Sequence, residues 1–381
     1  MNNLHLVMND FRHPSRVLKQ VDSVSALTDV GHVYVGSLCG DDQATDEVIS
    51  KKASIKRFYL RTRWLPKGPL VQVAKYLEFT MRVFLFYRFK DISLVNVHHF
   101  ALLPLGYLMK LSCGAKLIYD AHELETEQEG ILGIRKKFAK ILERIFIKKA
   151  DHVFVVSESI ADWYQENYAI IRPTVVMNAP RFIMVKRNNY FREHFSLRPD
   201  QKIALYQGGL SPGRGIEEIV AAFSDRTDDS VVIIFMGYGS LEDQIISEAN
   251  RSGNIYFHPA VSPNELLKYT GSADFGMCLI QNTCKSYFYC MPNKLFEYLM
   301  TGLPVLVSNM KEMGEFVEKY EVGHVLKDFG VSAINRAVDE ILAADLALFQ
   351  KNARIASMEH SWELQEAKMI ADYQILLSKI N

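Results

Sequence analysis

Four glycines and an arginine follow a short apolar run in the segment Tyr206-Gln-Gly-Gly-Leu-Ser-Pro-Gly-Arg-Gly. Glycines let backbone N–H groups approach a phosphate, and the helix predicted after them would direct its positive N-terminus at the same anion. We expect Gly208 and Gly209 to contact a phosphate and Arg214 to bind a diphosphate through two hydrogen bonds. The spacing matches neither a P-loop nor a dinucleotide-binding Gly-x-Gly-x-x-Gly motif. An ordinary glycine-rich turn is the alternative.

A second polar cluster lies at the predicted start of a helix that begins at Pro292 and ends before Gly302. Asn293 and Lys294 fall in its first turn, beside backbone N–H groups that have no partner within the helix. Glu297 lies one turn further along, and its carboxylate can accept both hydroxyls of a ribose. The two segments together predict a site for a nucleotide diphosphate.

Few residues have the spacing of a metal site. His98 and His99 follow a predicted strand, but no third ligand is spaced to join them. The pairs Asp41-Asp42 and Asp228-Asp229 fall in polar loops. No Cys-x-x-Cys pair occurs, and we expect the cysteines to be reduced. We therefore expect no essential metal ion and no cofactor.

Short apolar runs alternate with helical patterns along all 381 residues, which predicts two α/β domains with parallel sheets. The predicted strands of the first half are 33–37, 94–98, 115–120 and 152–157, and those of the second are 203–207, 231–236, 255–258, 275–279 and 305–308. A polar stretch without periodicity separates the two series. We predict an N-terminal domain (1–180), a linker (181–198), a C-terminal domain (199–360) and a final helix (361–381). Ligands of such sheets bind beyond the carboxyl ends of the strands, where both polar segments lie.

The run Pro292-Asn-Lys-Leu-Phe-Glu-Tyr-Leu-Met-Thr-Gly-Leu-Pro-Val resembles the nucleotide-sugar motif of the family 4 retaining glycosyltransferases, which have the GT-B fold. Other segments resemble further elements of that family in the same order along the chain, namely 9–19, 119–124, 155–160 with 177–180, and 272–276. The resemblance implies two Rossmann-like domains that face each other across a cleft, and a C-terminal helix that crosses back to the N-domain. It also implies a metal-independent hexosyltransferase (EC 2.4) that retains the anomeric configuration of the sugar.

The resemblance carries over residue by residue onto both domains. It implies that Arg214 and Glu297 are catalytic together with His122, which would line the cleft after the strand that ends at Asp120. The implied donor-binding residues are Gly208, Gly209, Arg214, Tyr289, Asn293, Lys294, Leu295 and Glu297. The implied acceptor-side residues are Arg12, Arg16, His122 and Glu123. Glutamates alternate from 123 to 129, and we expect a solvated acidic stretch in which Glu123 and Glu125 can orient acceptor hydroxyls.

The chain departs from the family at the donor sugar. The family has two glutamates separated by seven residues; Glu297 matches the second, and Tyr289 replaces the first, which contacts sugar hydroxyls. A tyrosine hydroxyl can hydrogen-bond a sugar, but without charge. Two other functions therefore stay open. One is a nucleotide-sugar epimerase of the same architecture, for which we find no paired catalytic carboxylates. The other is a non-catalytic nucleotide-sugar-binding partner, favoured by Tyr289 and by the uncharged Leu210.

Residues 51–90 hold eleven lysines and arginines, many aromatic residues and a single acid, Glu78. Such a stretch can lie on an anionic membrane surface, or it can be a helix that packs on the core and exposes a solvated basic face. A patch of this kind suggests a saccharide or lipid-linked saccharide acceptor, as in the assembly of cell-surface polysaccharides, and no nucleic acid partner. The N-terminus does not resemble a signal peptide, and no uncharged apolar run reaches about 18 residues. We expect a cytoplasmic protein, either free or peripheral on the inner face of the cell membrane.

Overall fold

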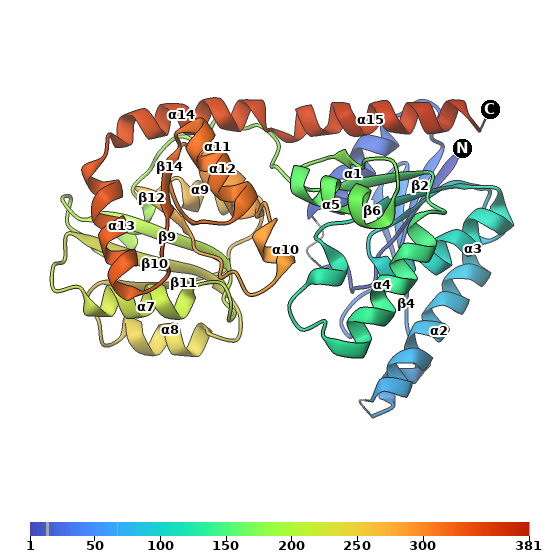
Figure 1. The fold of residues 1–381 in the computed structure, drawn as a ribbon, viewed down its shortest axis with the longest axis horizontal. Helices are drawn as coiled ribbons and strands as arrows, with labels where there is room; N and C mark the ends of the chain where they lie inside the picture. Colours follow the sequence, from blue (N-terminus) through green and yellow to red (C-terminus); the bar gives the residue numbers. More distant parts are fainter. Residues whose placement is uncertain (13–14, 67, 381) are drawn as a thin grey trace. The chain divides into compact units, whose positions relative to one another are not determined.

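The structure is a computed structural model that describes residues 1–12, 15–66 and 68–380. His13, Pro14 and Lys67, which belong to the segments 9–19 and 51–90, lie outside the described residues. The chain forms two compact units, Met1–Val176 with Glu366–Asn381, and Met177–Gln365 (Figure 1). Each unit contains one sheet whose strand pairs are parallel apart from one edge hairpin. The predicted α/β class with two Rossmann-like sheets is confirmed.

The first unit has an eight-stranded sheet with the order β3-β4-β2-β1-β5-β6-β7-β8. Its central strand β1 pairs in parallel with both β2 and β5. We did not predict β1, the β3–β4 hairpin or the short β8, whereas β2, β5, β6 and β7 lie where strands were expected. The strands are β1 (Asn2–Leu6), β2 (His32–Leu38), β3 (Asp46–Ser50), β4 (Ala53–Phe58), β5 (Ile92–Val97), β6 (Lys116–Asp120), β7 (His152–Val155) and β8 (Thr174–Val175).

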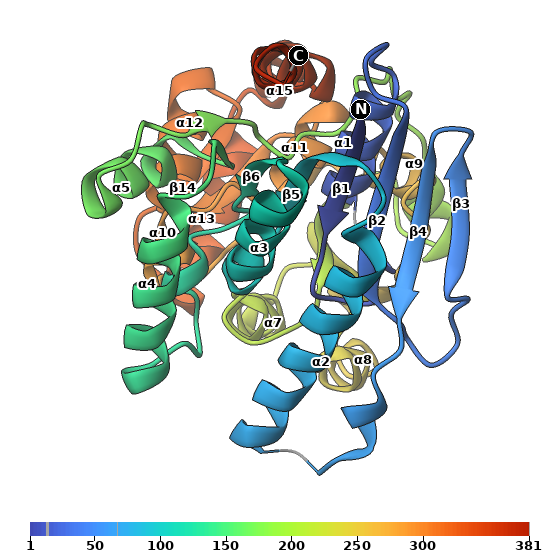
Figure 2. The same ribbon diagram turned by 90° about the vertical axis from the view of Figure 1, so that its right-hand side faces the viewer.

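Neighbouring residues of β6 point to opposite faces of this sheet, as strand geometry requires. Tyr119 donates a hydrogen bond of 2.8 Å to Glu143 of α4 (Gly133–Ile147), and Asp120 pairs with Arg16 of α1 (Ser15–Ser25). The sheet face that carries Tyr119 is covered by helices α2 (Pro69–Tyr87), α3 (Leu103–Cys113) and α4 (Figure 2). Helix α3 contacts both α2 and α4. Glu143 is fully buried and also accepts hydrogen bonds from the hydroxyls of Tyr164 and Tyr168 on α5 (Glu158–Tyr168), which fixes α4 and α5 together.

The last helix, α15 (Trp362–Ser378), contributes all but its first turn to the first unit. Asp372 lies 3.2 Å from the His152 ring of β7, and the buried Tyr373 hydroxyl contacts the Asn96 amide of β5. Both contacts are made within the first unit. The predicted return of the C-terminal helix to the N-domain is therefore confirmed.

The basic stretch 51–90 is not one continuous helix. Its first part forms β4, followed by a short 3-10 turn (Arg61–Trp64) and then α2. Several of its cations have local partners: Lys52 donates to the backbone oxygens of Leu27 and Val30, and Arg57 is buried against Glu47. Among the described residues, no helix is both long and apolar enough to span a membrane.

The second unit has a six-stranded sheet with the order β11-β10-β9-β12-β13-β14. Apolar side chains alternate between two buried clusters, so that Leu205 and Ile234 pack on one face, and Tyr206 and Phe235 pack on the other. Both faces are thus covered, as in a doubly wound sheet. The strands are β9 (Lys202–Gly209), β10 (Val231–Tyr238), β11 (Ile255–Pro259), β12 (Phe275–Cys278), β13 (Val305–Ser308) and β14 (Gly323–Leu326).

Helix α11 (Asn293–Met300) lies against the end of β12 in this unit. Its buried Tyr298 hydroxyl donates to the backbone oxygen of Leu205 and accepts from the backbone N–H of Gln207. A Cβ atom at Gly276 would lie 2.4 Å from the Tyr298 ring, so only glycine permits this approach. The predicted helix start at Pro292 and its end before Gly302, whose φ is +71°, agree with the structure.

Candidate active site

The glycine-rich segment forms the turn between β9 and helix α7 (Ile216–Asp225). Gly208 has a φ of +110° and Gly215, the residue before α7, a φ of +71°, both in the region that favours glycine. A Cβ atom at Gly215 would lie 2.1 Å from the backbone oxygen of Leu279. The glycines therefore allow a turn in which Gly208 and Gly209 are exposed at the carboxyl end of β9.

Two cations lie at this end of the sheet, each over an aromatic ring. The Arg214 guanidinium is 4.8 Å from the centre of the Tyr287 ring, and Lys294 Nζ is 3.6 Å from the centre of the Tyr206 ring. Burial raises the pKa of the Cys278 thiol at the end of β12, while Lys294 and Arg214 act in the opposite direction. The structure thus brings Arg214, the predicted diphosphate ligand, and Lys294, a predicted donor-binding residue, close to Cys278 at the end of β12.

The N-terminus of helix α11 suits an anion better than the N-terminus of α7 does. Its first turn contains no acidic residue, whereas the first turn of α7 contains Glu217 and Glu218. The Asn293 side chain accepts a hydrogen bond of 2.8 Å from Asn178, and Lys294 is half-buried beside it. Leu295 is wholly buried in the core, so its prediction as a donor contact is corrected: it anchors the helix.

Glu297 is held by a polar chain that we did not predict from the sequence. Gln207 Nε2 donates to Glu297 Oε2 at 2.6 Å, and Gln207 Oε1 accepts from the Thr270 hydroxyl at 2.7 Å. Gln207 is itself buried at the end of β9. In the sequence, only the position of Gln207 inside the Tyr-Gln-Gly-Gly segment could have indicated that it belongs to the site. This chain orients the carboxylate that we expect to bind ribose.

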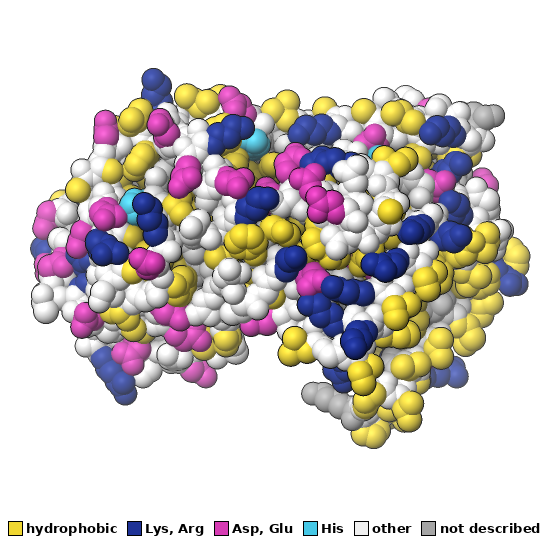
Figure 3. Space-filling view, viewed as in Figure 1, with side chains coloured by type: hydrophobic (Ala, Val, Ile, Leu, Met, Phe, Trp, Pro, Cys, Tyr) yellow, Lys and Arg dark blue, Asp and Glu magenta, His cyan; other side chains and the backbone are white. Residues whose placement is uncertain are grey.

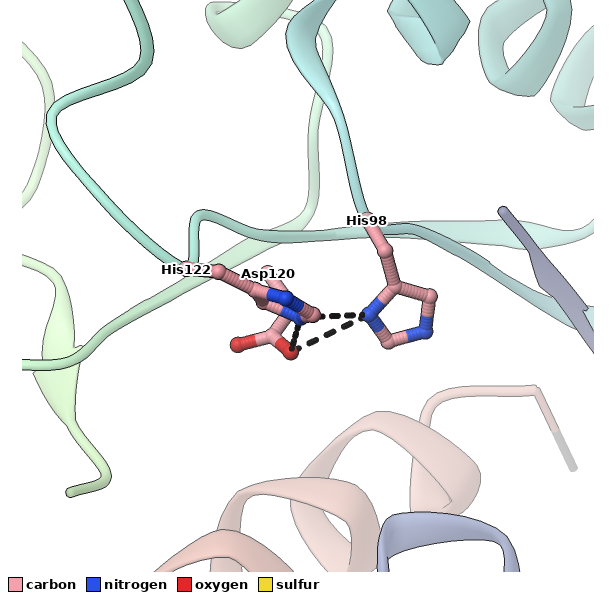
Figure 4. A group of neighbouring side chains, drawn as sticks. All are labelled: His98, Asp120 and His122. Carbon is pink, nitrogen blue, oxygen red and sulfur yellow. Dashed lines mark hydrogen bonds and ion pairs between the residues drawn. The ribbon is translucent and has the colours of Figure 1, made fainter. Parts of the chain in front are cut away.

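In the first unit, Asp120 is the centre of a buried polar cluster (Figure 4). Its carboxylate accepts hydrogen bonds from Arg16 at 2.6 and 3.0 Å and from Gln20 at 2.8 Å. His122 Nε2 lies 2.9 Å from the same carboxylate, and His98 Nδ1 lies 3.1 Å from it. Burial alone would raise the pKa of Asp120, but Arg16 and the histidines outweigh it and hold the pKa well below its usual range.

Arg16 does not occupy the position expected of an acceptor ligand. Its side chain is 3% exposed, and its remaining donor contacts the Val176 backbone oxygen at 2.6 Å. We correct the predicted role: Arg16 is the buried counter-ion of Asp120. Two other predicted acceptor-side residues are accessible, since Arg12 forms an exposed ion pair with Asp10 and His122 is 32% exposed.

A chain of histidines continues from Asp120 into the sheet. The Asn3 amide contacts His5 Nε2 at 3.2 Å, and His5 Nδ1 contacts His98 Nε2 at 2.9 Å. With the Asn3 amide as donor, neutral rings place a proton on His5 Nδ1 and on His98 Nδ1, so His98 donates to Asp120. Burial supports neutral rings, because it lowers the pKa of His98 to about 4 and that of His5 well below its usual value. In the neutral tautomer of His122 that carries its proton on Nε2, this N–H is directed to Asp120 and Nδ1 is an acceptor.

His98, Asp120 and His122 are also the one group of three potential metal ligands within residues 1–12, 15–66 and 68–380. We considered His98 with His99 from the sequence and did not predict this trio. Its ligand atoms lie 2.9 to 3.1 Å apart, which suits one face of a metal site as well as a hydrogen-bonded cluster. Arg16 Nε and Gln20 Nε2 both donate to this carboxylate oxygen, and the Arg16 guanidinium balances the carboxylate charge, so the network accounts for the arrangement without an ion.

The acidic stretch after His122 is not solvated as expected. Glu125 is 3% exposed, with Oε2 at 3.3 Å from His99 Nε2, and Glu127 pairs with Lys136 and Lys140 of α4. Burial, with the nearby Glu143 and Glu123 charges, raises the pKa of Glu125 well above its usual value. A buried carboxyl of this kind supports the loop and cannot serve as an open acceptor ligand. Glu123 is only half-buried.

Two protein-family models match most of the chain between them. Residues 24–179 match the model described as Glycosyltransferase Family 4, and residues 188–357 match the model described as Glycosyl transferases group 1. A relative described as an uncharacterised glycosyltransferase from Methanocaldococcus jannaschii is 21% identical over 342 residues, covering 83% of this chain and 82% of its own length.

Solved structures share the fold over the whole chain. Sucrose-phosphate synthase from Thermosynechococcus elongatus has a TM-score of 0.81 at 16% identity and covers 100% of both chains. HepE from Anabaena, solved in complex with UDP-glucose, has a TM-score of 0.74 at 14% identity, with 98% of this chain and 99% of that chain covered. WaaG, a glycosyltransferase of lipopolysaccharide biosynthesis, has a TM-score of 0.68 at 14% identity and covers 97% and 98%.

Proposed function

Because this chain is a glycosyltransferase with the GT-B fold, we propose that it transfers a sugar from a nucleotide diphosphate to a saccharide or lipid-linked saccharide, with retention of configuration. The observation that carries the proposal is the convergence of Gly208, Gly209, Arg214, Lys294 and Glu297 at the carboxyl end of one sheet. HepE, which shares the fold, binds UDP-glucose, and this supports a nucleotide-sugar donor.

In the proposed reaction, the bond between the anomeric carbon and the diphosphate breaks, and negative charge develops on the leaving phosphate. The backbone N–H groups of Gly208 and Gly209, the Arg214 and Lys294 side chains and the α11 N-terminus stabilise that charge. Glu297 binds the ribose hydroxyls. The acceptor hydroxyl attacks from the same face, and the departing phosphate oxygen takes its proton. These cations supply the charge stabilisation that a metal would otherwise provide, so we propose that transfer needs none.

We propose that His122 is the residue of the first unit that contacts the sugar. With Nε2–H held by Asp120, its Nδ1 can accept a hydrogen bond from a sugar hydroxyl. Arg12 and Glu123 complete the proposed acceptor side. The proposal includes no general base among these residues.

A membrane-associated acceptor is supported by the outer surface of α2 and α4. Figure 3 shows hydrophobic side chains gathered over these helices with lysines and arginines among them. Leu70, Ile134 and Phe138 are 85%, 86% and 66% exposed. Exposed apolar residues amid basic ones favour anionic lipid surfaces. We propose that this surface docks on the inner face of the cell membrane and that the enzyme builds cell-surface polysaccharide.

The donor site is tested by calorimetric titration with UDP, GDP, ADP and dTDP. We expect one of these to bind, Glu297→Ala to weaken that binding at least tenfold, and Arg214→Ala to abolish transfer while the protein stays folded. Arg251→Ala is a matched control, because Arg251 is 72% exposed beyond α8 (Glu242–Ala249) of this unit and should change neither quantity. Unchanged affinity in Glu297→Ala would refute the ribose assignment.

The membrane surface is tested by co-sedimentation with phosphatidylglycerol vesicles. We expect the protein to sediment with them and Ile134→Glu combined with Phe138→Glu to release it. Ile171→Glu is the control, since Ile171 is 93% exposed in the first unit but lies outside α2 and α4. Equal binding of all three proteins would show that the surface of α2 and α4 does not bind the membrane, and failure of the unmodified protein to sediment would remove the membrane from the proposal.

A further inference from the structure

Four cations, not two, surround the carboxyl ends of β9, β12 and β13. Beside Arg214 and Lys294, the structure places Lys285 of α10 (Lys285–Phe288) and Lys311 of α12 (Lys311–Tyr320) around one tyrosine. Lys285 Nζ is 6.0 Å and Lys311 Nζ 5.8 Å from the centre of the Tyr289 ring. Each of the four head groups is thus held near an aromatic ring, where a cation is attracted weakly but keeps its charge.

The charges of these cations are not neutralised by carboxylates of the described chain. Within residues 1–12, 15–66 and 68–380, none of the four forms an ion pair. The nearby acids hydrogen-bond to amides: Glu297 to Gln207, and Glu218 to Gln281. A sugar-linked nucleotide diphosphate carries two negative charges, and Arg214 and Lys294 suffice for them. Lys285 and Lys311 are left for another anion.

A pocket of about 410 Å³ lies at the carboxyl ends of β12, β13 and β14. Asn282, Ser308 and Lys327 are among the residues that line it. Along the chain, the lining segment 308–310 is followed by Lys311, and the lining segment 281–283 is separated from Lys285 by Cys284 alone. A pocket of this volume accommodates a small ligand, and one lysine, Lys327, lines it.

We infer that the donor sugar is a hexuronate whose C6 carboxylate is bound by Lys285 and Lys311. The inference rests on the proposed function and names its substrate class. A glutamate at position 289 would repel such a carboxylate, whereas the tyrosine adds a neutral hydroxyl and a ring that holds both ammonium groups in place. Charge-assisted hydrogen bonds to a carboxylate are stronger than the lysine–ring contacts, so the lysines can leave the ring for the substrate.

The test compares sugar nucleotides that differ only at C6. UDP-glucuronate is compared with UDP-glucose, and GDP-mannuronate with GDP-mannose, with UDP and GDP as references. We expect at least one uronate to bind about tenfold or more tightly than its neutral partner. The combined variant Lys285→Ala and Lys311→Ala should lose that preference and keep its affinity for the free nucleoside diphosphate. Lys319→Ala, on the same helix as Lys311 and beside Tyr320, is the matched control and should behave as the wild type.

The outcomes separate this inference from the proposed function. If UDP or GDP binds, but the neutral sugar nucleotide binds as tightly as the uronate or more tightly, the hexuronate assignment is overturned. The transferase proposal then still stands. A uronate preference that survives loss of both lysines would also overturn the assignment. Failure of every nucleoside diphosphate to bind would refute the donor site itself.

Discussion

Replacing Asp120 by asparagine would leave the Arg16 guanidinium buried without its counter-charge. The two groups are joined at 2.6 and 3.0 Å, and their side chains are 3% and 0% exposed. Removing one partner of a buried ion pair costs about 3–5 kcal/mol, because the remaining charge keeps its desolvation penalty. Such a loss is a large share of the roughly 5–15 kcal/mol typical of a domain. We therefore expect Asp120→Asn to lower the free energy of unfolding of the first unit by about 3–5 kcal/mol.

Urea denaturation measures this difference, with near-ultraviolet circular dichroism to follow tertiary structure. The control is Asp162→Asn, which breaks the exposed pair between Arg172 and Asp162, whose side chains are 39% and 53% exposed. Exposed pairs contribute less than about 1 kcal/mol. The combined variant Arg16→Met and Asp120→Leu, which removes both charges, should be more stable than Asp120→Asn. If Asp120→Asn costs no more than Asp162→Asn, the cluster is not the buried ionic centre described above.

Acidification from about pH 6.5 to 4 should lower the free energy of unfolding. The unfolded chain protonates His98 in this range, whereas the folded ring, whose pKa is lowered to about 4, stays neutral. His98 alone should account for about 3 kcal/mol of this loss in the free energy of unfolding. His98→Gln should flatten the measured dependence of unfolding free energy on pH, and an unchanged slope would contradict the assignment. Gly215→Ala should lower the free energy of unfolding by about 1–3 kcal/mol, because Gly215 has a positive φ and an added Cβ would meet the Leu279 oxygen. Gly209→Ala is the control and should change this free energy little, because its added Cβ meets nothing within 4 Å. Thermal or urea unfolding measures both. Equal effects would show that the turn tolerates a side chain. Treatment with EDTA should leave the transfer rate unchanged, and a loss that Mg²⁺ or Mn²⁺ restores would refute metal independence.

The sequence predicted those parts of the site that depend on local chain geometry. Gly215 and Pro292 define a turn and a helix start through their own backbone preferences, so these preferences alone placed Arg214 and Glu297 on their elements. Strands such as β9 and β10 are recognisable in the sequence as short apolar runs.

The rest of the site depends on contacts between residues that are far apart in the sequence, and these could not be predicted from it. Arg16 and Asp120 are 104 residues apart in the chain, and nothing near Arg16 indicates that it is buried. The same holds for Glu125, whose polar neighbours predicted exposure while its packing against His99 buries it. For the basic stretch, the sequence left a membrane-surface segment and a core-packed helix open, and a single helix was wrong for another reason: β4 is an inner strand of the sheet, and pairing with β2 overrode the charged composition.

The division of α15 between the units has a consequence for the order in which the protein matures on the ribosome. The second unit is continuous, from Met177 to Gln365, so all its strands have been synthesised before the last helix is complete. The first unit begins earlier but needs residues 366–380, and until they emerge Asn96 and His152 lack Tyr373 and Asp372. Domains tend to fold as units during synthesis, with the N-terminal one first. Here the unit that starts the chain is the last to be finished.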